Sequence, residues 1–251
     1  MPFQKVQSEK LSSAVVNQIE LLILRGILRP GERLPSERDL AEKLGVSRPS
    51  LREAISELQA QGLLAARAGA GIYVADVLGS AFSPALINLF SRHDEAVSDY
   101  LTFRRDMEGL AAERAARYGT ETDLKVIDEI FQKMEAAGDG MGRELDADFH
   151  IAIIEASHNV LMLHMMRLMF DLLREGVFYN RQVMFSQNTT KSDLLEQHRA
   201  INTALQARDG KAARAALEQH LEFVCEAYED ARRAERNEEI ARQRLDHEYN
   251  R

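Results

Sequence analysis

Apolar residues recur every three or four positions near the start of the chain and predict an amphipathic helix over residues 9–26. Two further helices are indicated by their end signals. Ser36 has the chemistry of an N-cap and Gly45 that of a C-terminal cap, so a helix is expected between them. Ser47 caps the next helix, whose apolar stripe continues to about Gln61. Helix, glycine-containing turn and helix together form the outline of a helix-turn-helix.

The pattern then changes from helical spacing to two short apolar runs. Residues 63–67 and 72–74 favour β-strands, and the glycine-rich stretch between them favours a tight turn. A hairpin directly after the second helix of a helix-turn-helix is a wing. Arg48 and Arg52 share one face at the start of that helix, where a recognition helix meets base edges and phosphates. The alternative is that two exposed arginines only solvate the helix, but the turn and the wing in register favour DNA binding.

Beyond Pro84 the chain contains no proline and is rich in Ala, Leu, Glu and Arg, which indicates a helical domain. Six helical segments are expected, with breaks near Gly119, Gly138, Asn159, Ser186 and Gly210. The predicted core stripe of the first segment consists of Ala96, Tyr100, Phe103, Met107 and Leu110. The fold class is therefore mainly α, with an N-terminal winged helix-turn-helix, a small β-hairpin wing and a C-terminal helical bundle.

Four regions follow from these patterns. Residues 1–75 form the DNA-binding domain, and residues 76–90 form a linker. Residues 91–232 form the helical domain, which is expected to hold the ligand and to dimerise. Residues 233–251 alternate basic and acidic side chains and are expected to form an exposed, charged C-terminal tail.

Charge and composition narrow the function classes. The net charge is −8 at pH 7, but residues 1–75 hold ten Lys/Arg against eight Asp/Glu, and the remainder holds 22 against 32. A negative net charge of the whole chain is compatible with a local DNA-binding face. Cys225 is the only cysteine, which excludes an internal disulfide framework and a Cys-rich zinc site. No apolar run reaches the ~18 residues of a membrane span, and the first residues lack the pattern of a signal peptide. We therefore expect a cytoplasmic protein without a membrane partner.

Three sequence blocks stand out in the first domain. They are Arg-Pro-Gly-Glu-Arg-Leu-Pro-Ser-Glu-Arg-Asp-Leu-Ala from Arg29, Gly-Val-Ser-Arg-Pro-Ser-Leu-Arg-Glu-Ala-Ile from Gly45, and the stretch from Leu58 to Gly62-Leu-Leu. Together they resemble the GntR family of bacterial repressors. The resemblance covers residues 9–75. It implies that double-stranded operator DNA is contacted by Arg38, Ser47, Arg48, Ser50 and Arg52. It also implies that Gly69 lies at the wing tip, near the minor groove. Some members carry a polar residue where this chain has Ala68.

Ionisable side chains interrupt the apolar pattern of the helical domain. Asp146 and His150 lie four residues apart on one helical face, which suits joint binding of one ion. His198 and His220 each lie in a helical segment that has an apolar stripe. Three imidazoles and a carboxylate would suit zinc, nickel or manganese and would leave positions for water or an anionic ligand. Spacing alone cannot show that these helices converge, and an isolated Asp-x-x-x-His pair also occurs by chance on surface helices.

The helical domain resembles the ligand-binding FCD domain of the FadR subfamily of GntR regulators. The similar residues are Arg104 with Glu108, Asp146-Ala-Asp-Phe-His150, Glu155-Ala-Ser-His-Asn159, His198-Arg-Ala-Ile and His220. Such domains are antiparallel helical bundles, and many hold a metal. The resemblance implies a divalent transition metal, zinc before nickel or manganese, and its ligands would be Asp146, His150, His198 and His220.

The same resemblance implies an effector. Arg104 would clamp a carboxylate, for which its planar fork is suited. Within the subfamily, the chain looks most like the repressors of the pyruvate dehydrogenase complex and the lactate- and glycolate-responsive regulators. This similarity points to a small carboxylate such as pyruvate, lactate or glycolate.

The patterns together predict a ligand-responsive transcriptional repressor. Two recognition helices must reach symmetric half-sites, so a homodimer on a palindromic operator is expected. The rival hypothesis is a metal-dependent, hydrolase-like enzyme, because a metal with open positions could activate water. That hypothesis leaves the winged helix unexplained and lacks a separate general base, so we predict that the protein is not an enzyme. A helical scaffold without a ligand cannot account for Arg104 together with three histidines.

Overall fold

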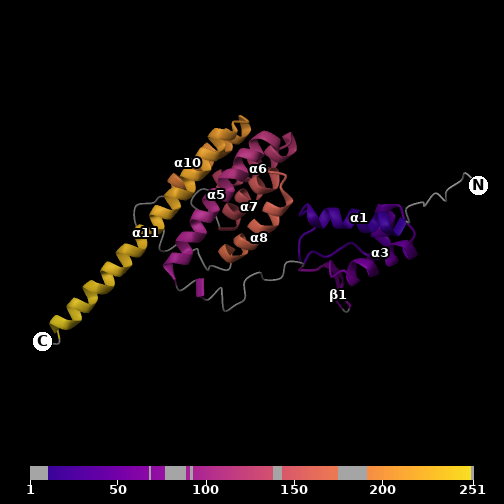
Figure 1. Cartoon of the computed structure of the whole chain (residues 1–251), viewed down its shortest axis with the longest axis horizontal. Helices are drawn as coiled ribbons and strands as arrows, with labels where there is room; N and C mark the ends of the chain where they lie inside the picture. Colours follow the sequence, from indigo (N-terminus) through magenta and orange to yellow (C-terminus); the bar gives the residue numbers. More distant parts are fainter. Residues whose placement is uncertain are drawn as a thin grey trace, which may run out of the picture. The chain divides into compact units, whose positions relative to one another are not determined.

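The computed structural model describes residues 11–67, 69–76, 89–90, 93–137, 143–174 and 191–249. The chain divides into two compact units, Met1–Ala81 and Phe82–Arg251 (Figure 1). Most of the expected linker, residues 77–88, lies outside the described residues, as do the expected helix breaks at Gly138 and Ser186.

The N-terminal unit is built on three helices, α1 (Leu11–Leu24), α2 (Glu37–Leu44) and α3 (Arg48–Ala60). The predicted caps of α2 are confirmed. The Ser36 hydroxyl accepts a hydrogen bond from the Asp39 amide at 3.3 Å, and Gly45 adopts a φ of 65° at the C-terminal end. Because glycine has no Cβ, it takes this left-handed conformation without steric strain and turns the chain into α3. The helices enclose one apolar core, which includes Val15, Ile19, Leu51, Ile55 and Leu58.

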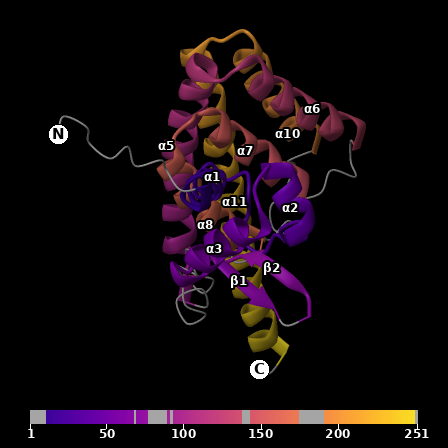
Figure 2. The same ribbon diagram turned by 90° about the vertical axis from the view of Figure 1, so that its right-hand side faces the viewer.

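A two-stranded antiparallel sheet follows α3 and forms the wing (Figure 2). Strands β1 (Leu64–Arg67) and β2 (Gly71–Val74) pair with Leu64 opposite Val74, and both of these side chains are buried. The segment before α2 also joins the wing, because the Leu34 amide donates to a carbonyl of β2 at 2.9 Å. The prediction of a winged helix-turn-helix is therefore confirmed.

The C-terminal unit is a helical bundle, as predicted (Figure 1). Its helices in the described ranges are α5 (Asp94–Tyr118), α6 (Glu121–Ala137), α7 (Arg143–Ala156), α8 (Val160–Arg174), α10 (Lys191–Gln206) and α11 (Gly210–Tyr249). α5 packs along α11 and against α7, while α10 packs against α11, α6 and α5. These contacts bring α5, α7, α10 and α11 around a shared interior.

Helix α11 is continuous over 40 residues and includes most of the segment expected as a charged tail. Its first part packs in the bundle, whereas residues 235–249 are all exposed, and Figure 1 shows this part, in yellow, extending beyond the other helices of the unit. Arg242 and Glu238 form an ion pair one turn apart at 3.1 Å, which is typical of a solvated helix. None of the helices in the described ranges combines the length and the apolar character needed to cross a bilayer.

The core stripe predicted for α5 is wrong in part. Phe103 and Leu110 are each 37% exposed, whereas Arg104 and Glu108 are only 3% and 1% exposed. The face of α5 that is buried carries Val97, Tyr100, Leu101, Arg104, Glu108, Ala111, Ala112 and Ala115. Periodicity assigns apolar residues to the interior and charged residues to solvent, so it missed a helix whose buried face contains two charged side chains.

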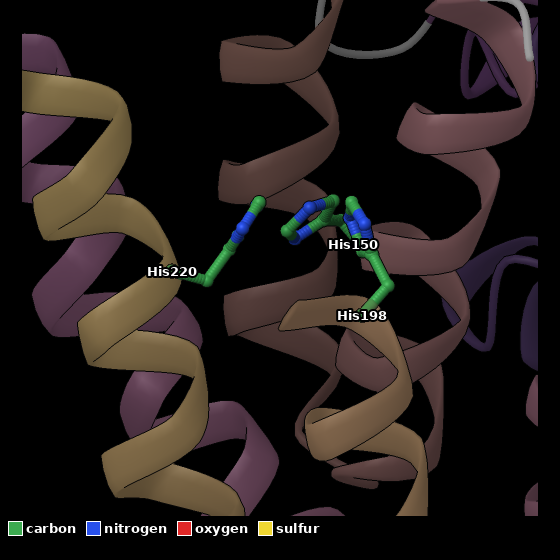
Figure 3. A group of neighbouring side chains, drawn as sticks. All are labelled: His150, His198 and His220. Carbon is green, nitrogen blue, oxygen red and sulfur yellow. The ribbon is translucent and has the colours of Figure 1, made fainter. Parts of the chain in front are cut away.

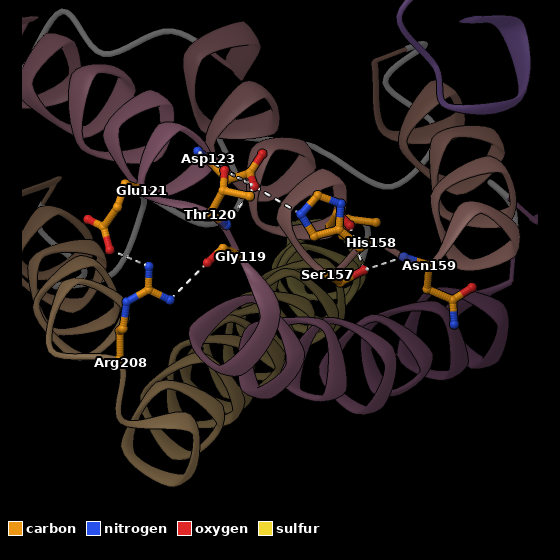
Figure 4. A network of polar contacts seen from close by, with 9 residues as sticks. Gly119, Thr120, Glu121, Asp123, Ser157, His158, Asn159 and Arg208 are labelled. Carbon is orange, nitrogen blue, oxygen red and sulfur yellow. Dashed lines mark hydrogen bonds and ion pairs between the residues drawn. The ribbon is translucent and has the colours of Figure 1, made fainter. Parts of the chain in front are cut away.

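Polar contacts link the α5–α6 connection to the α7–α8 and α10–α11 connections (Figure 4). At the start of α6 the Asp123 amide donates to the Thr120 hydroxyl at 3.2 Å, and the Thr120 amide donates to the Asp123 carboxylate at 2.8 Å. The same carboxylate lies 2.9 Å from Nε2 of His158, between α7 and α8. Arg208, between α10 and α11, donates to the Gly119 carbonyl at 2.8 Å. The α5–α6 connection is thus bonded to both of the others.

Candidate metal centre and DNA-binding face

Three histidines from three helices converge in the interior of the bundle (Figure 3). His150 lies on α7, His198 on α10 and His220 on α11, and their rings point toward one another. One ring nitrogen from each lies within 4.8 Å of the others. All three residues are at most 3% exposed. The fold therefore brings together side chains that are far apart in the sequence, in a place closed to solvent.

An oxygen atom lies within hydrogen-bonding distance of Nδ1 of each imidazole and orients the ring. The three contacts are His150 to Glu108 Oε2 at 2.5 Å, His198 to the Leu194 carbonyl at 2.7 Å, and His220 to Gln197 Oε1 at 2.8 Å. Such oxygens accept hydrogen bonds, so they favour a proton on Nδ1 and leave Nε2 unprotonated.

Two of the remaining ring nitrogens have unsatisfied bonding capacity. Nε2 of His150 and Nε2 of His198 are buried and have no hydrogen-bond partner in the described part of the chain. Buried polar atoms are normally paired, and an unpaired one calls for an explanation such as a bound ion. Neutral imidazole is a common ligand of zinc and of related divalent metals. The residues present therefore fit a transition metal.

Asp146, the fourth ligand expected from the sequence, lies beside this cluster but is not part of the group of three nitrogens. It is 8% exposed, and its Oδ1 is 3.2 Å from Nε2 of His198, within ion-pair distance but outside hydrogen-bond geometry. Burial alone would raise the pKa of Asp146, but the contact with His198 and the positive charge of the nearby imidazoles when they are protonated outweigh burial and hold this pKa well below 3.8. The carboxylate is thus ionised, as a metal ligand must be.

Burial acts in the opposite direction on His220. Burial and the neighbouring His198 and His150 lower the pKa of His220 well below 6.5. The imidazole is therefore neutral at pH 7, which is the form that binds a metal.

Arg104, expected as a carboxylate clamp, is buried in the same interior. Its Nε donates to Glu108 Oε1 at 2.6 Å, and its guanidinium carbon lies 4.8 Å from the ring centroid of Phe170. Burial alone would lower the pKa of Arg104, but the Glu108 carboxylate and Tyr100 outweigh it, so the pKa rises and the guanidinium stays charged. Nη2 of Arg104 is buried without a hydrogen-bond partner among the described residues. This nitrogen is therefore available to a bound anion.

Several residues of this interior received no role from the sequence. Glu108 contacts both Arg104 and His150, and Phe170 lies under the guanidinium. Gln197, directly before His198, supports His220 instead. The sequence carries only a weak signal for them, because Glu108 follows Arg104 by one helical turn and Gln197 has no distinguishing context.

The two arginines singled out for DNA binding lie at the start of α3. Arg48 is exposed. Arg52, one turn further on, has a 68% exposed side chain, and its Nε donates to Glu37 of α2 at 2.8 Å. Because the opposite face of α3 is buried, both guanidinium groups lie on the solvent side of the helix. An exposed positive surface of this kind suits phosphates and base edges.

The other DNA contacts implied by the sequence lie close to these arginines in the chain. The Ser47 hydroxyl accepts from the Ser50 amide at 3.3 Å and so caps α3. Arg38 on α2 is 75% exposed and pairs with Asp39 at 3.3 Å. Gly69 in the wing turn has a φ of 70°, and nothing lies within 4 Å of where a Cβ would be. Ser47, Arg38 and Gly69 are exposed and Ser50 is half-buried, and the contacts of the two serines and of Arg38 are local.

A winged helix-turn-helix in one unit and a helical bundle with a buried, charged interior in the other are the features of a two-domain DNA-binding regulator. Residues 11–74 match the gntR family of bacterial regulatory proteins, and residues 99–223 match the FCD domain. The chain belongs to the GntR family, in the subfamily that carries an FCD domain, as its sequence motifs indicated.

Its relatives are transcriptional regulators. The putative L-lactate dehydrogenase operon regulatory protein of Escherichia coli K12 is 36% identical over 223 residues, which cover 87% of this chain and 86% of the relative. The Glc operon transcriptional activator of the same organism is 33% identical over 88% of this chain and 89% of the relative. The regulator LutR of Bacillus subtilis is 36% identical over 81% of this chain and 94% of the relative.

A solved structure of Streptococcus agalactiae GntR aligns with a TM-score of 0.55 at 27% identity and covers 86% of this chain and 99% of that one. The chain is a transcriptional regulator and not an enzyme, and the comparisons do not support the hypothesis of a metal-dependent hydrolase.

Proposed function

We propose that this regulator binds a palindromic operator as a homodimer, and that a small carboxylate bound beside a metal in the FCD domain changes its operator affinity. One observation carries the proposal. Three buried atoms in one interior lack a hydrogen-bond partner among the described residues: Nε2 of His150, Nε2 of His198 and Nη2 of Arg104. The two imidazole nitrogens suit a cation, and the guanidinium nitrogen suits an anion. A metal and a carboxylate together would satisfy all three.

The metal would be held by His150, His198 and His220, with Asp146 as a fourth ligand. Zinc is proposed first and nickel or manganese next, because the set combines imidazoles with one carboxylate. A bound metal supplies a positive centre with open positions for an anionic oxygen. The ionised Asp146 and the neutral His220 already have the protonation states that binding requires.

The effector would be a small 2-hydroxy or 2-oxo acid. The charged guanidinium of Arg104 would hold its carboxylate, and the Phe170 ring beneath that guanidinium supports its orientation. Lactate is the first candidate because a relative is named for the L-lactate dehydrogenase operon, and pyruvate and glycolate follow. Such acids carry one carboxylate for Arg104 and a second oxygen that could reach the metal.

The coupling to DNA would arise from the packing of the bundle. The proposed ligand contacts come from α5, α7, α10 and α11, so a ligand that bridges them favours one arrangement of these helices. If that arrangement determines the spacing of two winged helices in a dimer, effector and operator affinities are linked. Typical coupling of ~1–3 kcal/mol changes affinity by ~5–150-fold, and DNA must then change effector affinity by the same factor.

We propose repression as the mode of action, in the cytoplasm where bacterial operator DNA is found. One relative is named an activator, so a reporter assay must record both directions. A rise of reporter expression upon deletion of the protein supports repression. A fall of expression overturns that mode and leaves the ligand-responsive DNA binding in place.

The deciding experiment is a titration of operator affinity with lactate, pyruvate and glycolate. We expect one acid to shift the affinity of the wild type, and Arg104→Lys to lose that response, because lysine keeps the charge but not the planar fork. The matched control is Arg105→Lys. Arg105 is the next residue of α5, and it pairs with Glu222 of α11. If an acid binds the wild type yet leaves operator affinity unchanged, it is not the effector. If Arg104→Lys responds as the wild type does, the clamp is wrong.

A further inference from the structure

Glu108 forms polar contacts with both halves of the proposed site. It lies on α5, one turn after Arg104, and is 1% exposed. Oε1 accepts a hydrogen bond from Arg104 Nε at 2.6 Å, and Oε2 lies 2.5 Å from Nδ1 of His150. A buried carboxylate is costly unless both of its oxygens are paired, and here each oxygen has a different partner.

The contact with His150 determines which nitrogen carries the proton. An ionised carboxylate can only accept, so Nδ1 of His150 must be the donor and Nε2 must hold the lone pair. That Nε2 is buried without a hydrogen-bond partner among the described residues, and the His150 ring points toward the other two imidazoles. Glu108 therefore presents the correct nitrogen of His150 to the centre of the cluster.

The other two histidines have neutral supports. The Leu194 carbonyl accepts from His198, and Oε1 of Gln197 faces His220. A side-chain amide can rotate and donate through its NH2 group, so Gln197 permits either tautomer of its histidine. A carboxylate leaves no such choice. His150 is thus the histidine of the cluster that is held by a charged group, and that group also holds Arg104.

The contact with Arg104 determines which part of the guanidinium is free. Nε is bonded to Glu108, and Nη2 is buried without a hydrogen-bond partner among the described residues. We propose that Glu108 is the positioning residue that joins the metal centre to the carboxylate clamp, because it selects the metal-binding tautomer of His150 and orients Arg104 toward the acid. This inference rests on the proposed function and adds the residue through which its two ligands are connected.

The test is Glu108→Gln in the full chain. The amide oxygen can still accept from Arg104, but its NH2 group then faces His150 and requires Nδ1 to accept. The proton of His150 moves to Nε2, which can no longer bind a metal. We expect zinc affinity, measured by competition with a chromophoric chelator, to fall ~10–100-fold. The matched control is Glu135→Gln, which removes the same charge from an exposed ion pair with Arg199 and should keep wild-type affinity.

A spectroscopic measurement makes the inference independent of any folding defect in the variant. Long-range ¹H–¹⁵N spectra of chelator-treated protein report the tautomer of each histidine, and the His150 signals are those absent in His150→Asn. In the wild type, His150 should carry its proton on Nδ1. In Glu108→Gln, His150 should carry it on Nε2. At saturating zinc, Glu108→Gln should still bind lactate several-fold more weakly than the wild type.

The outcomes separate this inference from the proposed function. If the wild type takes up zinc and Glu108→Gln binds it within about threefold of wild type, the role of Glu108 is overturned while the metal centre stands. A proton on Nε2 of His150 in the wild type also overturns it, without any substitution. If the wild type binds neither zinc nor acid, the proposed function fails.

Discussion

The two regions of this molecule offer charged side chains in opposite environments. On α3, Arg52 is 68% exposed and has one partner, Glu37, on the neighbouring helix. In the bundle, Arg104 is 3% exposed and touches Glu108 and the ring of Phe170. The first arginine lies in water, where its charge is screened and its pair contributes little. The second is buried in the bundle, where every lost partner leaves a buried charge unpaired.

Because of this difference in burial, the two regions should respond differently to single substitutions. The arginines considered for DNA binding lie on α2 and α3 with exposed side chains, so substituting them should change recognition and leave folding intact. The site in the bundle depends on α5, α7, α10 and α11 at once, so substitutions should change ligand binding and stability together. The predictions below test that contrast, in order of decreasing expected effect.

The largest effect is expected for His198→Ala. Loss of a ligand should lower zinc affinity by more than the ~10–100-fold typical of an outer-shell residue, and the protein should change from about one metal per chain to none. Elemental analysis of protein purified without chelator measures this. His247→Ala, at an exposed position of α11, is the control and should keep the metal. A wild type that cannot be filled with zinc, nickel or manganese contradicts the site.

A smaller effect is expected for Arg48→Ala and Arg52→Ala, each of which should weaken operator binding by ~1–3 kcal/mol, with unchanged circular dichroism. A phosphate contact would also reduce the dependence of binding on salt. Gel shifts at several salt concentrations measure both quantities. Arg233→Ala, on the exposed part of α11, is the control. Unchanged binding by both α3 variants would remove this helix from the DNA interface.

The pH dependence of stability should differ between the regions as well. The folded-state pKa of His220 is well below 6.5, so the unfolded chain takes up a proton that the folded chain does not as pH falls below about 6.5. Stability of the metal-free protein is therefore unaffected by His220 above that pH and decreases below it, by at most ~1.4 kcal/mol per pH unit for this proton. Urea unfolding at pH 7.5, 6.5 and 5.5 measures the slope. His220→Asn should have a shallower slope, and an equal slope would contradict the assignment.

The smallest effect tests whether Ser47 is a cap, a DNA contact or both. Its hydroxyl accepts from the Ser50 amide, so Ser47→Ala should cost ~0.5–2 kcal/mol of stability. Ser47→Asp keeps the cap but places a negative charge toward the phosphates, so it should preserve stability and lose operator affinity. Thermal unfolding and gel shifts measured on both variants separate the roles. If Ser47→Asp binds DNA as the wild type does, Ser47 is only a cap.

The sequence alone determined the elements of the N-terminal unit because their signals are local. Ser36 bonds to a residue three positions away, and Gly45 takes a conformation that its own lack of a side chain permits. The two short apolar runs at residues 63–67 and 72–74, with the glycine-rich stretch between them, likewise predict the wing strands found in the structure. Interactions of this kind involve neighbours in the chain, and a single sequence contains them in full.

The interior of the bundle was decided by tertiary structure. The sequence indicated Asp146, His150, His198 and His220 only as candidates, since spacing cannot bring three helices to one point. On α5 its prediction failed where the site lies, because Phe103 and Leu110 are on the exposed side, while Arg104 and Glu108 take core positions. Two charged residues can be buried there only because each finds a partner, Glu108 for Arg104 and His150 from α7 for Glu108. The second of those partners comes from another helix, and no pattern within α5 could reveal it.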